Sequence, residues 1–303
     1  MKHEFLLKNA LNKEQLIKKN TLFKNFSFEV HLSNEIENLS DLKTSETKTE
    51  LGYLILDTFC DTPIKVIHTP FTKNNHFNIE EKNTKEILQY IIKTSEYVRK
   101  KQGYFKDIIV VIHNELSPMK MDQYGILSET IDILKNVSDE YPYVKIAIEN
   151  TTGAYKIKEM NYFTNLELAL LCDRKNIGTC LDTCHLKINK YIDDIMQQNY
   201  KNNPTKKIPT IDEFIKIHME YEKLNLIHFA NASDDLNGFG QNLGHGSGFF
   251  IDNNDDVNFA KEILSAYDKY GCKCPMTLEL IEKDYLNPIN VPKTLELLKT
   301  IDN

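Results

Sequence analysis

Short apolar runs alternate along this chain with longer segments in which apolar residues recur at helical spacing. Eight of the runs have the length of a buried parallel strand, and many of their residues are β-branched. These runs span residues 3–7, 26–32, 64–68, 107–113, 144–149, 177–182, 225–230 and 275–280. The helical spacing is clearest in residues 78–100 and 126–140 and in the final segment 291–303. The alternation predicts repeated strand–helix units around a parallel sheet.

Eight strands and a closing helix favour an α/β fold of the (β/α)8 TIM barrel type. A doubly wound open sheet is the alternative. The polar segment 189–210 interrupts the repeat between the sixth and seventh strands, and we expect an inserted loop there that begins with some helix. No linker divides the chain, so we expect a single domain over residues 1–303.

The composition is that of a globular enzyme rather than a fibrous or disordered chain, with 41% hydrophobic and 27% charged residues. The amino-terminal segment lacks the apolar core of a secretion signal, and no run approaches the roughly 18 apolar residues that span a bilayer. We therefore expect a cytoplasmic protein that does not contact a membrane, and we expect its six cysteines to be reduced thiols.

The net charge of −7 argues against a general nucleic-acid coat, although it allows a locally positive or metal-charged cleft. Arginine occurs only at positions 99 and 174. Two-pronged guanidinium contacts with phosphate are therefore scarce, and a phosphate-binding site would depend on lysine or on metal ions.

Six consecutive predicted strands, the third to the eighth, end on side chains that can bind metal. These side chains are His68, His113, Glu149, Asp182, His228 and Glu279. His185 follows three residues after Asp182. Because the carboxyl ends of barrel strands meet at one mouth, where active sites lie, we expect the six to converge there.

Imidazole and carboxylate ligands suit Zn²⁺, Mn²⁺ and related divalent ions. Three crowded carboxylates would repel one another unless cations offset their charge. Any one of the six side chains could be an ordinary hydrogen-bonded group or a helix cap, but the whole series favours a metal centre. His31 also ends a predicted strand, and we interpret it as a hydrogen-bonded barrel residue. We predict that His76 and His218 are surface residues.

Several ordered motifs resemble those of the xylose-isomerase-like barrel superfamily, and most closely those of endonuclease IV, the metal-dependent apurinic/apyrimidinic endonuclease. The motifs are IENTTG at 148–153, GTCLDTCHL at 178–186, HFANAS at 228–233, NLGHGSG at 242–248 and TLEL at 277–280. The resemblance runs in order from about residue 64 to residue 282, and the first 60 residues match only in fold pattern.

This resemblance implies a role for each strand-end residue. His68 and His113 would hold one metal, while Asp182, His228 and Glu279 would hold a second. Glu149 would bridge the two ions and orient the attacking hydroxide, as the catalytic residue. The implied cofactor is a pair of Zn²⁺ ions, with Mn²⁺ as an alternative, and His185 would belong to a third metal site.

The chain departs from the family at that third site. The family has an Asp-x-His pair shortly before the Leu-Gly-x-Gly loop, whereas this chain has Gly238 and Gly240. Three explanations remain open: the third site is absent, the substrate differs, or another residue of the same loop takes over. The candidates for such a replacement are Asp234, Asp235 and His245.

The resemblance implies a monomeric enzyme of base excision repair that cuts duplex DNA 5′ to abasic sites. Phe71 would enter the damaged duplex as a wedge, unless it is an ordinary packed loop aromatic, and Lys73 and Lys187 would contact phosphates. One alternative is a sugar isomerase or epimerase of the same superfamily, with a single Mn²⁺-like ion at Glu149, Asp182, His228 and Glu279. Another is a barrel that has lost its chemistry and only binds a partner.

Overall fold

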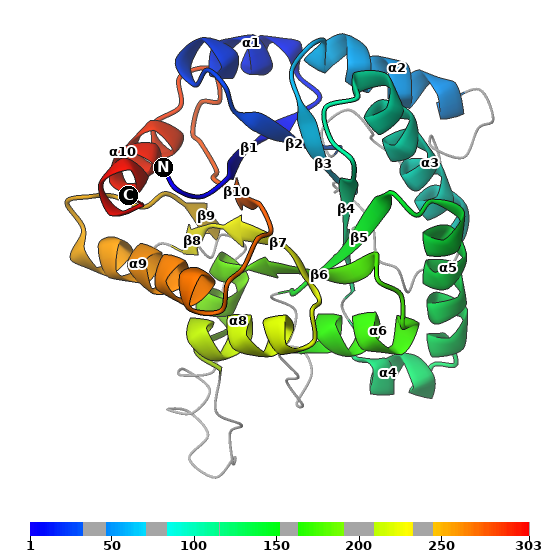
Figure 1. Cartoon of the computed structure of the whole chain (residues 1–303). Coiled ribbons are helices and arrows are strands. Elements are labelled where there is room, and N and C mark those ends of the chain that lie inside the picture. Colours follow the sequence, from blue (N-terminus) through cyan, green and yellow to red (C-terminus); the bar gives the residue numbers. More distant parts are fainter. Residues whose placement is uncertain are drawn as a thin grey trace.

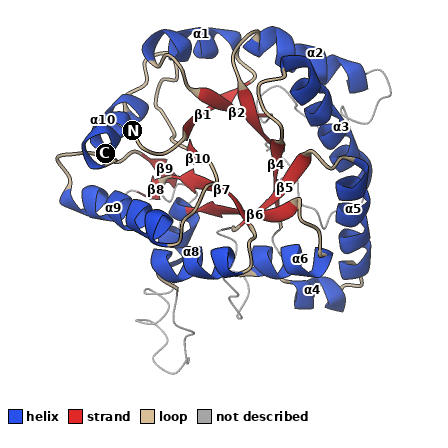
Figure 2. Ribbon diagram, in the orientation of Figure 1, coloured by secondary structure: helices blue, strands red, loops and turns tan. Residues whose placement is uncertain are grey.

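Eight parallel strands form a closed barrel, and the helices surround it (Figures 1 and 2). The computed structural model describes residues 1–32, 47–70, 84–114, 116–151, 163–190, 209–232 and 245–302. The TIM barrel prediction is confirmed, because the last barrel strand pairs with the first and leaves no open edge.

The barrel strands follow one another around the ring in chain order. They are β1 (Phe5–Ala10), β2 (Ser27–His31), β3 (Ile64–His68), β4 (Ile108–His113), β5 (Val144–Glu149), β6 (Ile177–Asp182), β7 (Leu224–Phe229) and β10 (Met276–Leu278). All eight predicted strands are present, and most bounds agree within two residues. The first strand begins and ends later than expected, because His3 and Glu4 precede it and Lys8 and Asn9 belong to it.

Helices connect the strands and cover the outside of the barrel (Figure 2). They are α1 (Lys13–Leu22), α2 (Thr47–Phe59), α3 (Thr84–Gln102), α4 (Pro118–Gln123), α5 (Leu127–Glu140), α6 (Thr164–Cys172), residues 183–190, α8 (Ile211–Glu220), α9 (Asn254–Lys269) and α10 (Asn290–Ile301). The expected inserted loop at 189–210 begins on a helix, as residues 189 and 190 are helical, and residues 191–208 lie outside the described part of the chain.

A short antiparallel ladder that the sequence pattern did not predict lies beyond β7. It consists of β8 (Asn231–Ala232) and β9 (His245–Ser247). The two strands are too short for a periodic signal. The ladder matters for the site because β9 begins at His245.

Both faces of the barrel strands are buried, and successive side chains alternate between them. The outward side chains pack against the helices in the main core, to which Val30, Ile67, Val110, Ile148, Leu181 and Ile227 belong. The inward side chains form a separate apolar cluster of Leu6, Val66, Ile109, Val111, Ala147, Cys180 and Leu226. The next inward residue of most strands is polar, and these polar residues form the candidate site.

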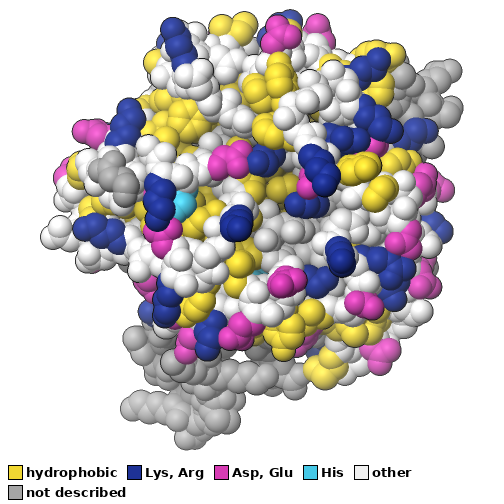
Figure 3. Space-filling view, viewed as in Figure 1, with side chains coloured by type: hydrophobic (Ala, Val, Ile, Leu, Met, Phe, Trp, Pro, Cys, Tyr) yellow, Lys and Arg dark blue, Asp and Glu magenta, His cyan; other side chains and the backbone are white. Residues whose placement is uncertain are grey.

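The surface of one barrel end is mixed in charge. Figure 3 shows lysine, arginine and acidic side chains interspersed with apolar ones, and almost no histidine surface is visible on that face. Among the described residues, no helix is both long and apolar enough to cross a bilayer. All six cysteines are described, and each is a free thiol.

Candidate metal centre

The six strand-end side chains predicted to bind metal lie together at the carboxyl-terminal mouth of the barrel. The register brings them into contact, because His113 is the parallel-strand neighbour of Glu149 and Asp182 is that of His228. Four of them, His68, Glu149, Asp182 and His228, are at most 2% exposed. The structure thus concentrates ionisable groups in a place where each charge is costly unless it is paired.

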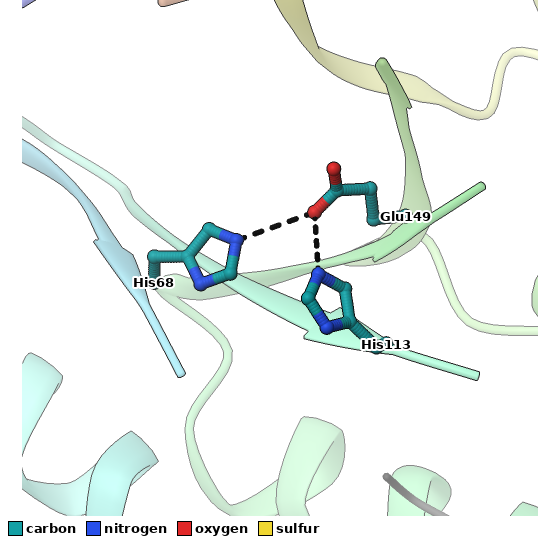
Figure 4. A group of neighbouring side chains, drawn as sticks. All are labelled: His68, His113 and Glu149. Atoms are coloured by element: carbon teal, nitrogen blue, oxygen red, sulfur yellow. Dashed lines mark hydrogen bonds and ion pairs between the residues drawn. The ribbon is translucent and has the colours of Figure 1, made fainter. Parts of the chain in front are cut away.

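The first group of ligand atoms comes from β3, β4 and β5 (Figure 4). His68 Nε2 lies 3.2 Å from Glu149 Oε2, and His113 Nε2 lies 2.8 Å from the same oxygen. His68 Nδ1 donates to the backbone oxygen of Thr69 at 2.9 Å, so a neutral His68 has its proton there. The lone pair on Nε2 then faces a carboxylate oxygen, an arrangement that requires a proton or a metal cation between the two atoms.

Burial indicates which of the two is favoured at His68. Desolvation lowers the pKa of His68, and the positive charge of nearby Lys8 lowers it further, against the opposing effect of Glu149. The imidazolium form is therefore disfavoured at neutral pH. A metal cation resolves the contact without charging the ring, so the first group fits a divalent ion.

The second group of ligand atoms surrounds His228. Its Nδ1 lies 3.1 Å from Glu149 Oε1, 2.6 Å from Glu279 Oε2 and 3.9 Å from Asp182 Oδ2. Glu279 Oε2 lacks the alignment of a hydrogen bond, and Asp182 Oδ2 has no hydrogen-bond partner among the described residues. One ligand atom from each of the four residues lies within 4.8 Å of the others, a spacing that suits coordination of one ion.

Without a cation, His228 would have to carry the compensating charge. Burial lowers its pKa, but the surrounding groups outweigh burial and raise it well above the ordinary value; the charged ones are Glu29, Glu279 and Glu149. The proton on Nδ1 of this imidazolium would point at the carboxylates of Glu149 and Glu279, where a metal ion could lie instead. The second group therefore also fits a divalent cation.

Glu149 connects the two groups. Its Oε2 faces His68 and His113, while its Oε1 faces His228. Burial raises the pKa of Glu149, but His228 and His113 outweigh burial and lower it well below the ordinary value. Glu149 is therefore a carboxylate with one oxygen available to each group, which is the geometry of a bridging ligand.

Asp182 combines two roles that the sequence presented as alternatives. Its Oδ1 accepts a hydrogen bond from the backbone nitrogen of His185 at 2.7 Å and caps the helix at 183–190. Its Oδ2 remains available to the second group of ligand atoms. Burial raises the pKa of Asp182, and a nearby cation would favour its charged form.

His185 lies beside His245 rather than beside an Asp-x-His pair. His185 Nδ1 donates to the backbone oxygen of Asn150 at 2.6 Å, and His185 Nε2 lies 2.8 Å from His245 Nε2. His245 Nε2 is also 4.0 Å from Asp182 Oδ2. Of the replacements considered for the third site, His245 is placed at His185 by the structure, whereas Asp234 and Asp235 lie outside the described residues.

The residues predicted to contact DNA are only partly placed. Lys187 Nζ donates to Asn231 Oδ1 at 2.9 Å and to the backbone oxygen of Ala232 at 3.0 Å, which ties the helix at 183–190 to β8. Phe71 and Lys73 lie outside the described residues, as do Gly238, Gly240 and His76.

The prediction for His218 was wrong. His218 lies in α8, is fully buried and donates from Nδ1 to the backbone oxygen of Phe214 at 2.8 Å. The spacing of Ile211, Phe214, Ile215 and His218 is that of one helix face, and this pattern could have revealed the burial.

Three inward residues of β1 and β2 also belong to the site, and they were not among the predicted ligands. Lys8 Nζ lies 2.7 Å from Glu279 Oε1, and Glu29 Oε2 lies 3.1 Å from His228 Nε2. The His31 ring is 4.7 Å from the His68 ring, edge to face, so His31 lies within the mouth. In β2 their signal is the two-residue period, because Glu29 and His31 alternate with the buried apolar residues Phe28 and Val30. β1 shows no such alternation, since Lys8 follows three apolar residues.

The fold is a closed (β/α)8 barrel with two groups of candidate metal ligands at its carboxyl-terminal mouth. No protein-family model matches the chain. The Probable endonuclease 4 of Campylobacter fetus subsp. fetus is 26% identical in an alignment of 195 residues that covers 55% of this chain and 64% of that protein. The match thus spans less than two thirds of the relative.

Solved structures with the same fold include an endonuclease and sugar epimerases. Endonuclease IV from Thermus thermophilus has a TM-score of 0.53 and 12% identity, covering 98% of this chain and 99% of its own. A D-tagatose 3-epimerase-like protein has a TM-score of 0.55 and 18% identity, with 98% and 96% coverage. A D-allulose 3-epimerase from Methylomonas sp. has a TM-score of 0.57 and 9% identity, with 98% coverage of both chains. At these identities the likeness shows the barrel fold.

Proposed function

We propose that this chain is a metal-dependent phosphodiesterase that cleaves duplex DNA 5′ to abasic sites, as in base excision repair, with Zn²⁺ or Mn²⁺ as its cofactor. The observation that carries the proposal is the position of Glu149 between two sets of ligand atoms. The sequence similarity to a probable endonuclease 4 supports the nuclease assignment.

Each proposed ion has a separate set of ligands. His68 Nε2, His113 Nε2 and Glu149 Oε2 would hold the first, and His228 Nδ1, Asp182 Oδ2, Glu279 Oε2 and Glu149 Oε1 the second. A bound pair of divalent ions supplies a Lewis acid for the phosphate and a water of lowered pKa. Glu149, held as a carboxylate, would orient that water toward the phosphorus atom.

The charge of the site favours an anionic substrate. Glu149, Asp182 and Glu279 contribute three negative charges, and the fourth buried carboxylate, Glu29, is offset by Lys8 at 3.4 Å. Two divalent cations therefore exceed the three remaining carboxylates by one positive charge. A phosphodiester, which carries one negative charge, matches this excess better than a neutral sugar does.

His185 and His245 supply a further pair of imidazole nitrogens next to Asp182. We propose that His245 takes the place of the family's Asp-x-His pair, so that His185 Nε2 and His245 Nε2, which are 2.8 Å apart, would both be ligands of a third ion. His185 has its proton on Nδ1, where Asn150 accepts it, and its Nε2 lone pair is therefore available. The metal content of His245→Ala tests this site, because one ion fewer per chain is expected.

We also propose that Phe71, Lys73 and Lys187 contact the DNA and that the enzyme acts as a monomer. Lys187 would have to exchange its bonds to Asn231 and Ala232 for a phosphate. The six free thiols support a reducing compartment such as the cytoplasm.

The deciding experiment is incubation of metal-loaded protein with a duplex oligonucleotide that contains one abasic analogue. We expect metal-dependent nicking on the 5′ side, at least about 100-fold slower in Glu149→Gln and in His113→Ala. Glu96→Gln is the matched control, because Glu96 pairs with Arg99 on α3 and its loss should leave nicking unchanged. Intact DNA under metal-replete conditions would contradict the proposal.

A sugar epimerase is the second candidate, and one observation favours it. Glu149, Asp182, His228 and Glu279 form a complete four-ligand set for one ion without His68 and His113. Glu149 and Glu279 could then exchange a proton beside a sugar carbonyl.

The metal content of His68→Ala/His113→Ala separates the two candidates. A nuclease with two ions should lose one of them, whereas a single-ion epimerase should retain its full content. Protein that holds less than one ion per chain after metal-replete purification would favour the third alternative, a barrel that only binds a partner.

A further inference from the structure

Two oppositely charged residues, the fully buried Glu29 and the partly buried Lys8, lie inside the barrel next to the ligand ring, and no proposed step uses them. We propose that Glu29 and Lys8 are positioning residues. Glu29 orients the ring of His228 so that its Nδ1 faces the proposed metal ion. Lys8 holds Glu279 so that its Oε2 faces the same ion. This inference rests on the proposed metal centre, and it concerns ligand preorganisation rather than chemistry.

Glu29 determines which nitrogen of His228 is available. Its carboxylate can only accept, so its Oε2, 3.1 Å from His228 Nε2, accepts a hydrogen bond from the N–H of that nitrogen. A metal ion would then replace the proton on His228 Nδ1, the nitrogen that lies beside Glu149 Oε1 and Glu279 Oε2. Histidines that bind metal commonly donate their second N–H to a carboxylate, which fixes both tautomer and ring orientation.

Lys8 acts on the other ligand of the same ion. Its Nζ lies 2.7 Å from Glu279 Oε1, which leaves Oε2 as the oxygen that faces His228. Glu279 follows the short strand β10 (Met276–Leu278) and is therefore not held by the barrel ladder itself. The ammonium of Lys8 thus supplies an anchor for a ligand that lies just past the end of its strand.

The pair is assembled by the barrel register. Lys8 and Glu29 are direct neighbours on β1 and β2, and Lys8 Nζ lies 3.4 Å from Glu29 Oε1. A single buried charge at either position would be strongly destabilising, whereas the two together offset each other. Glu29 is fully buried, so it acts through His228 and not on a substrate.

A role in charge balance alone makes a different prediction from a role in positioning. The double variant Lys8→Met/Glu29→Met removes one positive and one negative charge, and it therefore preserves the net charge of the site. Charge balance predicts that the double variant binds metal as the native chain does. Positioning predicts that its affinity remains low, because neither His228 nor Glu279 is held.

The test measures Co²⁺ and Zn²⁺ affinity by competition with a chromophoric chelator, together with the visible spectrum of bound Co²⁺. We expect an affinity about 10- to 100-fold lower and an altered Co²⁺ spectrum in the double variant and in Glu29→Met. Glu29→Gln can still accept from Nε2, so it should lose less than about tenfold. Glu96→Gln, on the outer helix α3, should match the native chain.

Thermal unfolding of the metal-free proteins identifies variants that fail to fold. If Glu29→Met does not fold, the comparison of Glu29→Gln with the double variant, which removes both members of the Lys8–Glu29 pair, decides the matter. Native affinity in the double variant would overturn the positioning role. A native chain that binds neither Co²⁺ nor Zn²⁺ would instead contradict the metal centre itself.

Discussion

Along several barrel strands, an apolar inward residue is followed by a polar or charged inward residue at the carboxyl-terminal mouth. Val66 is followed inward by His68, Val111 by His113, and Leu226 by His228. The lower layer is mostly apolar, whereas the layer at the mouth contains nearly all the buried charge of the barrel interior among the described residues. The strands that supply the apolar cluster also supply residues of the mouth, so the backbone does not distinguish the two layers.

The difference shows what each layer contributes. Apolar side chains in the lower layer stabilise the barrel by removing surface from water, and each needs only a suitable volume. Charged side chains at the mouth are costly to bury and stabilise nothing unless a partner offsets them. The charged layer is therefore explained by function, while the apolar layer is explained by folding, and substitutions should separate the two.

The largest change in stability is expected when a charged side chain is placed in the apolar cluster below the mouth. Val111→Asp places a carboxylate in the apolar cluster of the barrel interior, where burial removes its charge from water. We expect a loss of about 3–5 kcal/mol in the free energy of unfolding, measured by urea denaturation. Val111→Ala, which leaves only a small cavity, should lose less. Equal losses in the two variants would show that volume alone matters there.

A buried histidine in the apolar packing outside the barrel should reveal itself through pH. Burial lowers the pKa of His218 to about 4, from an ordinary value of 6.5. The unfolded chain binds this proton as the pH falls below about 6.5, while the folded chain does so only near 4. Stability should therefore decrease over this interval, by up to about 3 kcal/mol.

The control for His218 is a variant that has no proton to bind. His218→Leu should lose less stability than the native chain between pH 6.5 and pH 4, as measured by thermal unfolding at a series of pH values. Parallel curves for the two proteins would mean that His218 takes up its proton without unfolding.

Removal of metal ions tests whether the charged layer at the mouth depends on cations for its stability. If divalent ions offset the carboxylates, they bind the folded chain and stabilise it by about 2.7 kcal/mol at 100 times their dissociation constant. Dialysis against a chelator should therefore lower the Tm, and Zn²⁺ or Mn²⁺ should restore it. A Tm that does not respond to either treatment would contradict the metal centre.

The smallest expected change in stability distinguishes the roles of the two carboxylate oxygens of Asp182. Asp182→Asn keeps a side-chain oxygen for the backbone nitrogen of His185, whereas Asp182→Ala loses the helix cap as well. We expect the alanine variant to be about 1 kcal/mol less stable than the asparagine variant. Both should bind metal at least about tenfold more weakly than the native chain, as measured by chelator competition. Native metal affinity in Asp182→Asn would exclude Oδ2 as a ligand.

Much of the fold was predictable because two kinds of periodicity alternate regularly. Fully buried parallel strands appear as continuous apolar runs, and a polar residue at the end of such a run is conspicuous. The convergence of His68, His113 and Glu149 followed from the parallel topology alone, because the carboxyl ends of the strands share one mouth.

The residues that were missed have physical reasons in common. Lys8 and Glu29 lie within their strands, and a charge there suggests a solvent-exposed face unless both faces are known to be covered. The contact of His185 with His245 joins residues 60 positions apart through a two-stranded ladder too short to leave a pattern. The burial of His218 differs from these, because the helix face that it shares with Phe214 was readable from the spacing; only its contact with Phe163, from outside α8, was not.

The two contacts of Asp182 limit which substitutions this position can accept. One oxygen caps a helix and the other faces the second group of ligand atoms, so a replacement has to satisfy two geometries at once. Asparagine preserves the cap but not the charge, and glutamate preserves the charge on a side chain one carbon longer. In a library of all single substitutions selected for function, position 182 should accept almost no replacement, whereas the neighbouring outward residue Leu181 should accept other apolar side chains.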